Sequence, residues 1–350
     1  MSGLRRSSVV LIVIGLLLLV LSAVTRFAIT PALSKLPTDV DTTATYSGTA
    51  TMLNSAAMAS GDLANAVAKD VPITLDQRVQ VTGEQEGLAI TERSSLLKGP
   101  GGLQKPSSIT YAIDRTTMEA TDQPPSGSGA TAASGLIFTL PLHPKPQNYS
   151  FYVPDLQAAA PLTYLGEGTV NDRDVLRYEV NASGALQNQD TLKSLPPALP
   201  KALIAGLVAT LPAEQGQAIS AALPTLPDTV PLAYTASSKI VLDADATTGA
   251  PLNSSIDQQI LATVMVNGQA VPLLPVLAVK ANLTPDSVAA AVTKAESAAQ
   301  KLTLLSVVVP LVLLVLGVIA IAIGVLRSRK PADDATDDTT ASATKELVND

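Results

Sequence analysis

The sequence holds few residue patterns that could do chemistry, and the first is a serine followed three residues later by a lysine. In Ser95-Leu-Leu-Lys98 the lysine could activate the serine hydroxyl, as in the S-x-x-K motif of serine acyl-enzymes. That mechanism also needs companion S-D-N and K-T-G segments, and the sequence contains neither. We therefore interpret the match as chance.

A second pattern places acidic residues at the spacing of a calcium loop. Asp243-x-Asp245-x-Thr247-x-Gly249 resembles the start of such a loop, but it lacks glycine at position 6, and Ser254 stands where the acidic ligand at position 12 belongs. The pattern favours a hairpin turn over a metal site.

The other candidates are weaker. The single histidine, His143, cannot build a His-rich metal cluster, and no G-x-S-x-G elbow accompanies it. The glycines of 99–102 are not followed by G-K-[ST], so they predict a loop and not a phosphate cradle. We predict no catalytic, cofactor-binding or metal-binding residues, and no cofactor.

Two long apolar runs dominate the rest of the chain. Only 15% of the residues are charged while 47% are hydrophobic, whereas soluble domains are roughly 25% charged. Residues 7–25 and 302–326 carry no charge, and as helices they would be about 28 and 37 Å long, enough to cross a hydrocarbon core of about 30 Å. The sequence predicts transmembrane helices over both runs.

Basic residues beside these runs predict their orientation. Arg5 and Arg6 precede the first run, and Arg327, Arg329 and Lys330 follow the second. Such clusters stay in the cytoplasm. We expect a plasma-membrane protein with a cytoplasmic N-terminus (1–6), a domain outside the membrane (26–301) and a cytoplasmic, acidic, disordered tail (327–350). Cleavage of the first run as a signal peptide remains an alternative.

The absence of cysteine favours a bacterial envelope over a eukaryotic secreted setting. The net charge of −7 argues against a nucleic-acid partner. Membrane lipids are the expected partners.

The sequence of the domain outside the membrane (26–301) predicts mainly antiparallel β-structure. Residues 71–81 alternate between apolar and polar side chains, which is typical of a half-buried strand. Hairpins are predicted over 164–180 and 239–260. Residues 185–228 predict a helical insertion, and 285–301 a helix capped by Thr284 that leads into the second span. The predicted fold class is a membrane protein in which two transmembrane helices flank an α+β, mainly antiparallel-β domain.

Small residues in the second run could serve helix packing. Gly317, Ala320 and Gly324 could lie against another transmembrane helix and support a helix–helix oligomer.

Several sequence segments together match the pattern of a known family. They are residues 4–15, 36–50, 113–117, 135–141 and the pair 164–170 and 176–180. With them the chain resembles the porin PorA family of actinobacteria over nearly its whole length. The resemblance implies a pore and brings no catalytic residues.

Three functions remain open. The first is a non-catalytic envelope protein whose domain binds a lipid or glycolipid or scaffolds a complex. The second is an oligomeric pore or transport component, as the family implies. The third is a hydrolase of envelope polymers, which would need carboxylates such as Asp114 and Glu167. We expect a protein that is not an enzyme.

Overall fold

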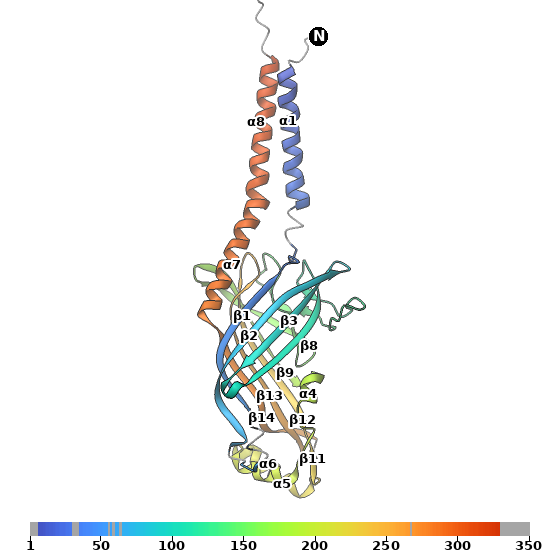
Figure 1. The fold of residues 1–350 in the computed structure, drawn as a ribbon, viewed down its shortest axis with the longest axis vertical. Coiled ribbons are helices and arrows are strands. Elements are labelled where there is room, and N and C mark those ends of the chain that lie inside the picture. Colours follow the sequence, from blue (N-terminus) through green and yellow to red (C-terminus); the bar gives the residue numbers. More distant parts are fainter. Residues whose placement is uncertain are drawn as a thin grey trace, which may run out of the picture. The chain divides into compact units, whose positions relative to one another are not determined.

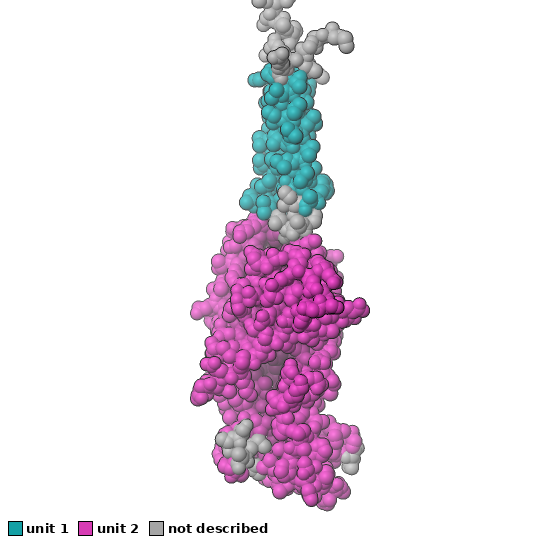
Figure 2. All heavy atoms as spheres, turned by 45° about the vertical axis from the view of Figure 1, so that its right-hand side comes forward, with its two compact units in different colours: residues 1–30, 303–350 teal, residues 31–302 magenta. Residues whose placement is uncertain are grey.

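The computed structural model describes residues 6–29, 35–54, 57, 60–62, 65–266 and 268–329. The chain divides into two compact units, residues 1–30 with 303–350 and residues 31–302, coloured teal and magenta in Figure 2. The predicted N-terminal segment 1–6 and acidic tail 327–350 lie almost entirely outside the described residues.

Residues 31–302 form a closed barrel whose strands run in the order β1-β14-β13-β12-β9-β8-β7-β6-β5-β4-β3-β2 (Figure 1). Neighbouring strands are antiparallel except for one parallel pair between β6 and β7. The strands are β1 (Asp41–Leu53), β2 (Val67–Gln85), β3 (Leu88–Lys98), β4 (Gln104–Asp114), β5 (Glu119–Ala120), β6 (Gly135–Leu136), β7 (Tyr149–Val153), β8 (Ala158–Val170), β9 (Arg173–Ala185), β12 (Ala233–Asp245), β13 (Pro251–Val266) and β14 (Gln269–Leu283). A separate small sheet pairs β10 (Ala198–Pro200) with β11 (Thr229–Pro231).

The barrel corrects the predicted fold class. We expected two transmembrane helices flanking an α+β domain, but strands dominate the described residues and close on themselves, and helices are few. Closure depends on the first strand: β1 pairs with β2 and also with β14, where Tyr46 lies opposite Leu283. This pairing gives two otherwise open sheet edges a partner, which satisfies their backbone N–H and C=O groups.

The helices are short or lie near the chain ends. They are α1 (Arg6–Val24), α4 (Gln189–Lys193), α5 (Lys201–Leu207), α6 (Ala213–Ala222), α7 (Pro285–Thr303) and α8 (Val309–Arg329). The Thr284 hydroxyl accepts a hydrogen bond from the Ser287 backbone N–H at 3.3 Å, so the predicted cap of α7 is confirmed. On the barrel side of α7, Ala295 is buried against Val175 and Leu252.

Two apolar helices, Ser7–Ala28 and Pro285–Ser328, are long and apolar enough to cross a membrane by length and composition. Within the unit of 1–30 and 303–350, α1 packs on α8 through glycines. A Cβ at Gly317 would lie 2.9 Å from the Gly15 carbonyl oxygen, and one at Gly324 would lie 3.0 Å from the Ser8 carbonyl oxygen. These glycines therefore allow the two backbones to approach closely.

The outer face of the barrel is charged. Ion pairs join neighbouring strands there, and each lies on the side of its strand that points away from the lumen. They are Arg78–Asp41, Lys98–Asp76, Lys239–Glu179 and Lys280–Asp257. Strands that face hydrocarbon carry an apolar outer band instead, so this wall has the character of a water-exposed surface.

Apolar clusters fill both ends of the lumen. At one end, Ile204 and Leu207 of α5 and Ile219 of α6 are buried against β12, β13 and β14. At the other, Leu136, Leu140 and the side chains of β9 and β12 form a second buried cluster. The α5–α6 segment therefore covers the end of the barrel with its apolar face.

Candidate functional site

The candidate site is the middle of the barrel lumen, where the side chains that point inward become polar. On β2, Gln77 lies between Leu75 and Val79 on the inward face, opposite Ser95 of β3. Across the barrel, Gln258 of β13 lies between two buried inward isoleucines, and its amide donates to the Ser238 hydroxyl at 3.3 Å. We call Gln77, Arg93, Ser95, Ser107, Ser238 and Gln258 the lumen polar set.

Five members of this set are partly or fully exposed, whereas Ser238 is buried. Gln77, Arg93, Ser95 and Gln258 are half-buried although they point into the barrel, and Ser107 is exposed. A side chain on the inward face can be exposed only to space inside the barrel or at an opening in its wall. The inward faces of β2, β3 and β4 are therefore accessible at these residues, whereas a third buried apolar cluster, which includes Tyr46, Leu75, Ile256 and Val279, lies beside them on the inward face of β1, β2, β13 and β14.

Arg93 is the charged member of the set. Alternation along β3 places it on the same face as Thr91 and Ser95, opposite Ile109 of β4. Its guanidinium donates to the Gln77 side-chain oxygen at 3.3 Å. No described carboxylate lies within ion-pair distance of it, whereas Arg78, on the outer face of β2, pairs with Asp41.

Two buried hydroxyls lie next to Arg93. Thr91 of β3 and Tyr111 of β4 face each other across the sheet, and both are fully buried. Neither hydroxyl has a hydrogen-bond partner among the described residues. The Tyr111 ring packs edge-on against Tyr152, with 5.9 Å between ring centroids, and burial raises the pKa of Tyr111 to about 12.

Asp155 adds an acid close to this group. It lies in the turn between β7 and β8. Burial raises the pKa of its carboxyl above the usual range, and the charge of Arg93 partly opposes that shift. Arg93 therefore influences Asp155 electrostatically without forming an ion pair with it.

The wall has a seam beside these residues. β4 pairs with β3 along its whole length, but its other edge pairs with β5 only at Ile113. The loop residues Thr121 and Thr131 bond to carbonyls at 112 and 110, so among the described residues the edge from Gln104 to Ile109 has no strand partner. Figure 2, which turns this side of the barrel forward, shows its surface hollowed at mid-height. Lys105 and Pro106 on the free edge disfavour pairing with an added strand.

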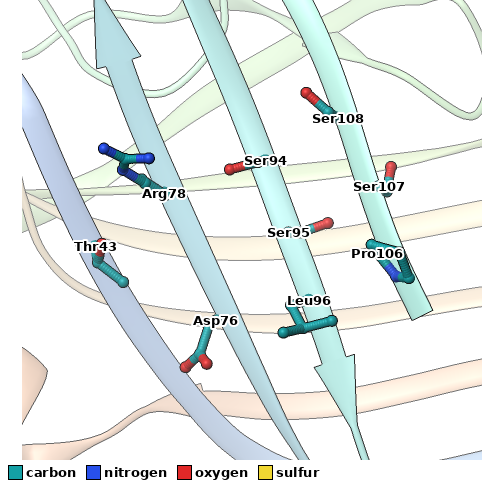
Figure 3. A pocket seen from close by; sticks show the side chains of 9 residues that line it. All are labelled: Thr43, Asp76, Arg78, Ser94, Ser95, Leu96, Pro106, Ser107 and Ser108. Carbon is teal, nitrogen blue, oxygen red and sulfur yellow. The ribbon is translucent and has the colours of Figure 1, made fainter. Parts of the chain in front are cut away.

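A shallow hollow of about 490 Å³ lies over β1–β4 (Figure 3). Its charged groups are already paired: Arg78 with Asp41 at 2.6 Å, and Asp76 with Lys98 at 2.7 Å. The Ser108 hydroxyl donates to Glu92 at 2.6 Å. The hollow therefore leaves few free groups for a ligand.

The residues singled out from the sequence are not brought together. Ser95 points into the barrel, whereas Lys98 bonds to Asp76 on the outer face, so the lysine cannot activate the serine. Asp245 accepts hydrogen bonds from the backbone of Thr247 and Thr248 within the turn, as the hairpin interpretation predicts. His143 is an exposed loop residue with a positive φ of 50°.

Asp114 and Glu167, the two carboxylates considered for hydrolysis, lie in different structural environments. Asp114 accepts backbone hydrogen bonds from Thr116 and Thr117, each at 2.8 Å, and the bond from Thr117 is the main reason that its pKa is lowered. Glu167 is an exposed residue of β8. Sequence reasoning missed the lumen polar set, because on β3 neither face is uniformly apolar and the inward side is not evident.

The family profile described as Porin PorA matches residues 7–326. No curated protein matches the chain. The profile match and the closed barrel contradict the expected location, which was a two-span plasma-membrane protein with cytoplasmic termini, and fit a porin-type protein of the cell envelope.

Proposed function

Because this chain belongs to the porin PorA family, we propose that it is a transport component of the cell envelope that carries an apolar molecule inside its barrel. The observation that supports this most is the distribution of polarity. The wall is charged outside, and the lumen holds three buried apolar clusters beside the partly exposed lumen polar set. A general diffusion porin has the opposite pattern, with an apolar outer band and a polar, water-filled interior.

The two buried ends argue against an open ion path through a single barrel. Ile204, Leu207 and Ile219 are almost completely buried at one end, and Tyr178 and Val180 at the other. Ions would have to cross both apolar clusters, and the desolvation cost would be several kcal/mol or more. An apolar molecule meets no such cost, since it exchanges water for hydrocarbon contacts.

An uncharged fluorescent probe, N-phenyl-1-naphthylamine, tests the proposal with the full chain in amphipol. We expect saturable binding by the natural protein and its loss in Gln258→Trp, which fills the lumen. Gln259→Trp is the matched control, because Gln259 is the next residue on β13 and points outward. Equal binding by the two variants would contradict the proposal.

Planar bilayers provide the test of the competing function. An oligomeric pore predicts stepwise conductance from the purified protein. A carrier of apolar molecules predicts none, and instead predicts faster transfer of the probe between vesicles. Conductance that Gln258→Trp abolishes and Gln259→Trp preserves would favour the pore.

A further inference from the structure

The lumen contains a positive charge, Arg93, that forms no ion pair with any described carboxylate, since Asp155 acts on it only at longer range. A half-buried arginine is normally matched by a carboxylate, since desolvating a cation without a partner costs several kcal/mol. Among the described residues, the Arg93 guanidinium donates only to the neutral amide oxygen of Gln77, at 3.3 Å. By contrast Arg177, on the outer face, forms an ion pair with Asp243 at 2.7 Å.

The surroundings of Arg93 offer further hydrogen bonds. Thr91 precedes it on the same face of β3, and Tyr111 lies opposite Thr91 on β4. Both hydroxyls are buried and unpartnered among the described residues, although buried hydroxyls nearly always have partners. A guanidinium and two hydroxyls are the donors that bind carboxylate or phosphate oxygens.

Access to Arg93 does not require passage through the closed ends. Its cross-strand neighbour on β4 is Ile109, which is the last residue of the free edge at the seam. Ser107, two residues away on the same inward face, is exposed. A molecule with a long apolar chain could therefore enter sideways at the free edge of β4.

We propose that the lumen holds an acidic amphiphile, with its headgroup on Arg93 beside Thr91 and Tyr111 and its chain along the apolar clusters. This inference rests on the proposed function and adds the class of cargo. A fatty acid and a lipid phosphate share this chemistry. Asp155 restricts the site, because a headgroup that approached its ionised carboxylate would be repelled.

The test compares dansyl-undecanoic acid with its uncharged amide, binding each to the full chain in amphipol at neutral pH. We expect the natural protein to prefer the acid by about tenfold or more, as expected for one charge-assisted contact in a partly desolvated site. Arg93→Gln should remove the preference, so that acid and amide bind equally. Arg93→Lys, which keeps the charge, should retain part of it.

Arg78→Gln is the matched control. Arg78 lies on the adjacent strand but points outward, where it pairs with Asp41. The acid preference should survive in this variant.

If Arg93→Gln keeps the preference, or the natural protein binds acid and amide equally, the headgroup site is refuted while the proposed function stands. Failure of both probes to bind would refute the proposed function as well. The comparison of acid with amide on the natural protein remains decisive if Arg93→Gln does not fold.

The source of the headgroup is resolved by competition. Displacement of the bound probe by unlabelled oleic acid but not by a lysophospholipid phosphate would identify the carboxylate as the preferred group, and the reverse order would identify the phosphate. Displacement by neither would contradict the site.

Discussion

Thr91 and Tyr111 face each other across β3 and β4 with both hydroxyls buried and neither bonded to a described residue. Two other buried tyrosines of the barrel are satisfied: Tyr46 shares a hydrogen bond of 2.7 Å with Ser254, and Tyr178 donates to the Lys145 carbonyl at 2.9 Å. The hydroxyl pair of Thr91 and Tyr111 is therefore a local exception, and it lies next to the lumen cation.

Removing the Tyr111 hydroxyl tests whether it is truly unsatisfied. We expect Tyr111→Phe to leave the free energy of unfolding unchanged or to raise it by up to about 1 kcal/mol, because an unpaired buried hydroxyl costs desolvation without a compensating bond. Tyr178→Phe should lower it by about 1 kcal/mol, since it loses a made bond. Chemical denaturation of ligand-stripped protein measures both. A larger loss for Tyr111→Phe than for Tyr178→Phe would contradict the assignment.

Two aspartates should respond to pH with opposite signs. Burial raises the pKa of Asp155, so its ionised form destabilises the folded state at neutral pH. Asp155→Asn should therefore raise the melting temperature at pH 7, and the gain should vanish as the pH falls below the unfolded value of about 3.9.

Asp76 provides the comparison. The hydrogen bond from Lys98, and then that from Thr45, lowers the pKa of Asp76, so its ionised form stabilises the folded state above the unfolded pKa. Asp76→Asn should lower the melting temperature at pH 7, and the loss should shrink as the pH falls through the folded pKa. Shifts of the same sign in the two variants would disprove this electrostatic account.

The closure of the barrel depends on a close approach at Gly48 of β1. A Cβ there would overlap the backbone of Lys280 and Ala281 on β14. Gly48→Ala should lower the free energy of unfolding by about 1–3 kcal/mol, the usual cost of overpacking. Gly83→Ala on β2 has nothing within 4 Å of the added Cβ and should change it little. Equal effects would mean that the β1–β14 contact does not limit closure.

Because the wall has a seam at the free edge of β4, we expect Ser107 and Ser108 to differ in their access to the lumen. The natural chain has no cysteine, so Ser107→Cys and Ser108→Cys each carry a single thiol. Both residues are exposed, but Ser107 points inward at the seam and Ser108 outward. We expect an amphiphile in the lumen to slow maleimide labelling at 107 and not at 108. Protection at both positions or at neither would argue against entry at the seam.

Local features of the fold could be predicted from the sequence. The alternation of 71–81 falls within β2, the turns at Asn171-Asp172 and after Asp245 join predicted hairpins, and Thr284 caps α7. Each depends on residues that are close in the chain. Membership of the porin PorA family was also confirmed.

The closure of the barrel and the identity of the side chains that face its lumen could not be predicted, because both depend on long-range strand register. The pairing of Tyr46 with Leu283 has no local signal, and β5 and β6 have only two residues each. On β3, the inward face carries Arg93 between Thr91 and Ser95 while Ile90 and Leu96 point outward, so polarity alone assigns the wrong face. Bulges near Val81 and Ala262 further change which side chains face inward.

The central claim is that the barrel carries an apolar molecule, and mass spectrometry of what remains bound to the purified full chain tests it most directly. We predict one amphiphile per barrel in the natural protein and in Gln259→Trp, and its loss in Gln258→Trp. No bound molecule in the natural protein, or an equal amount in both tryptophan variants when each is folded, would contradict the account.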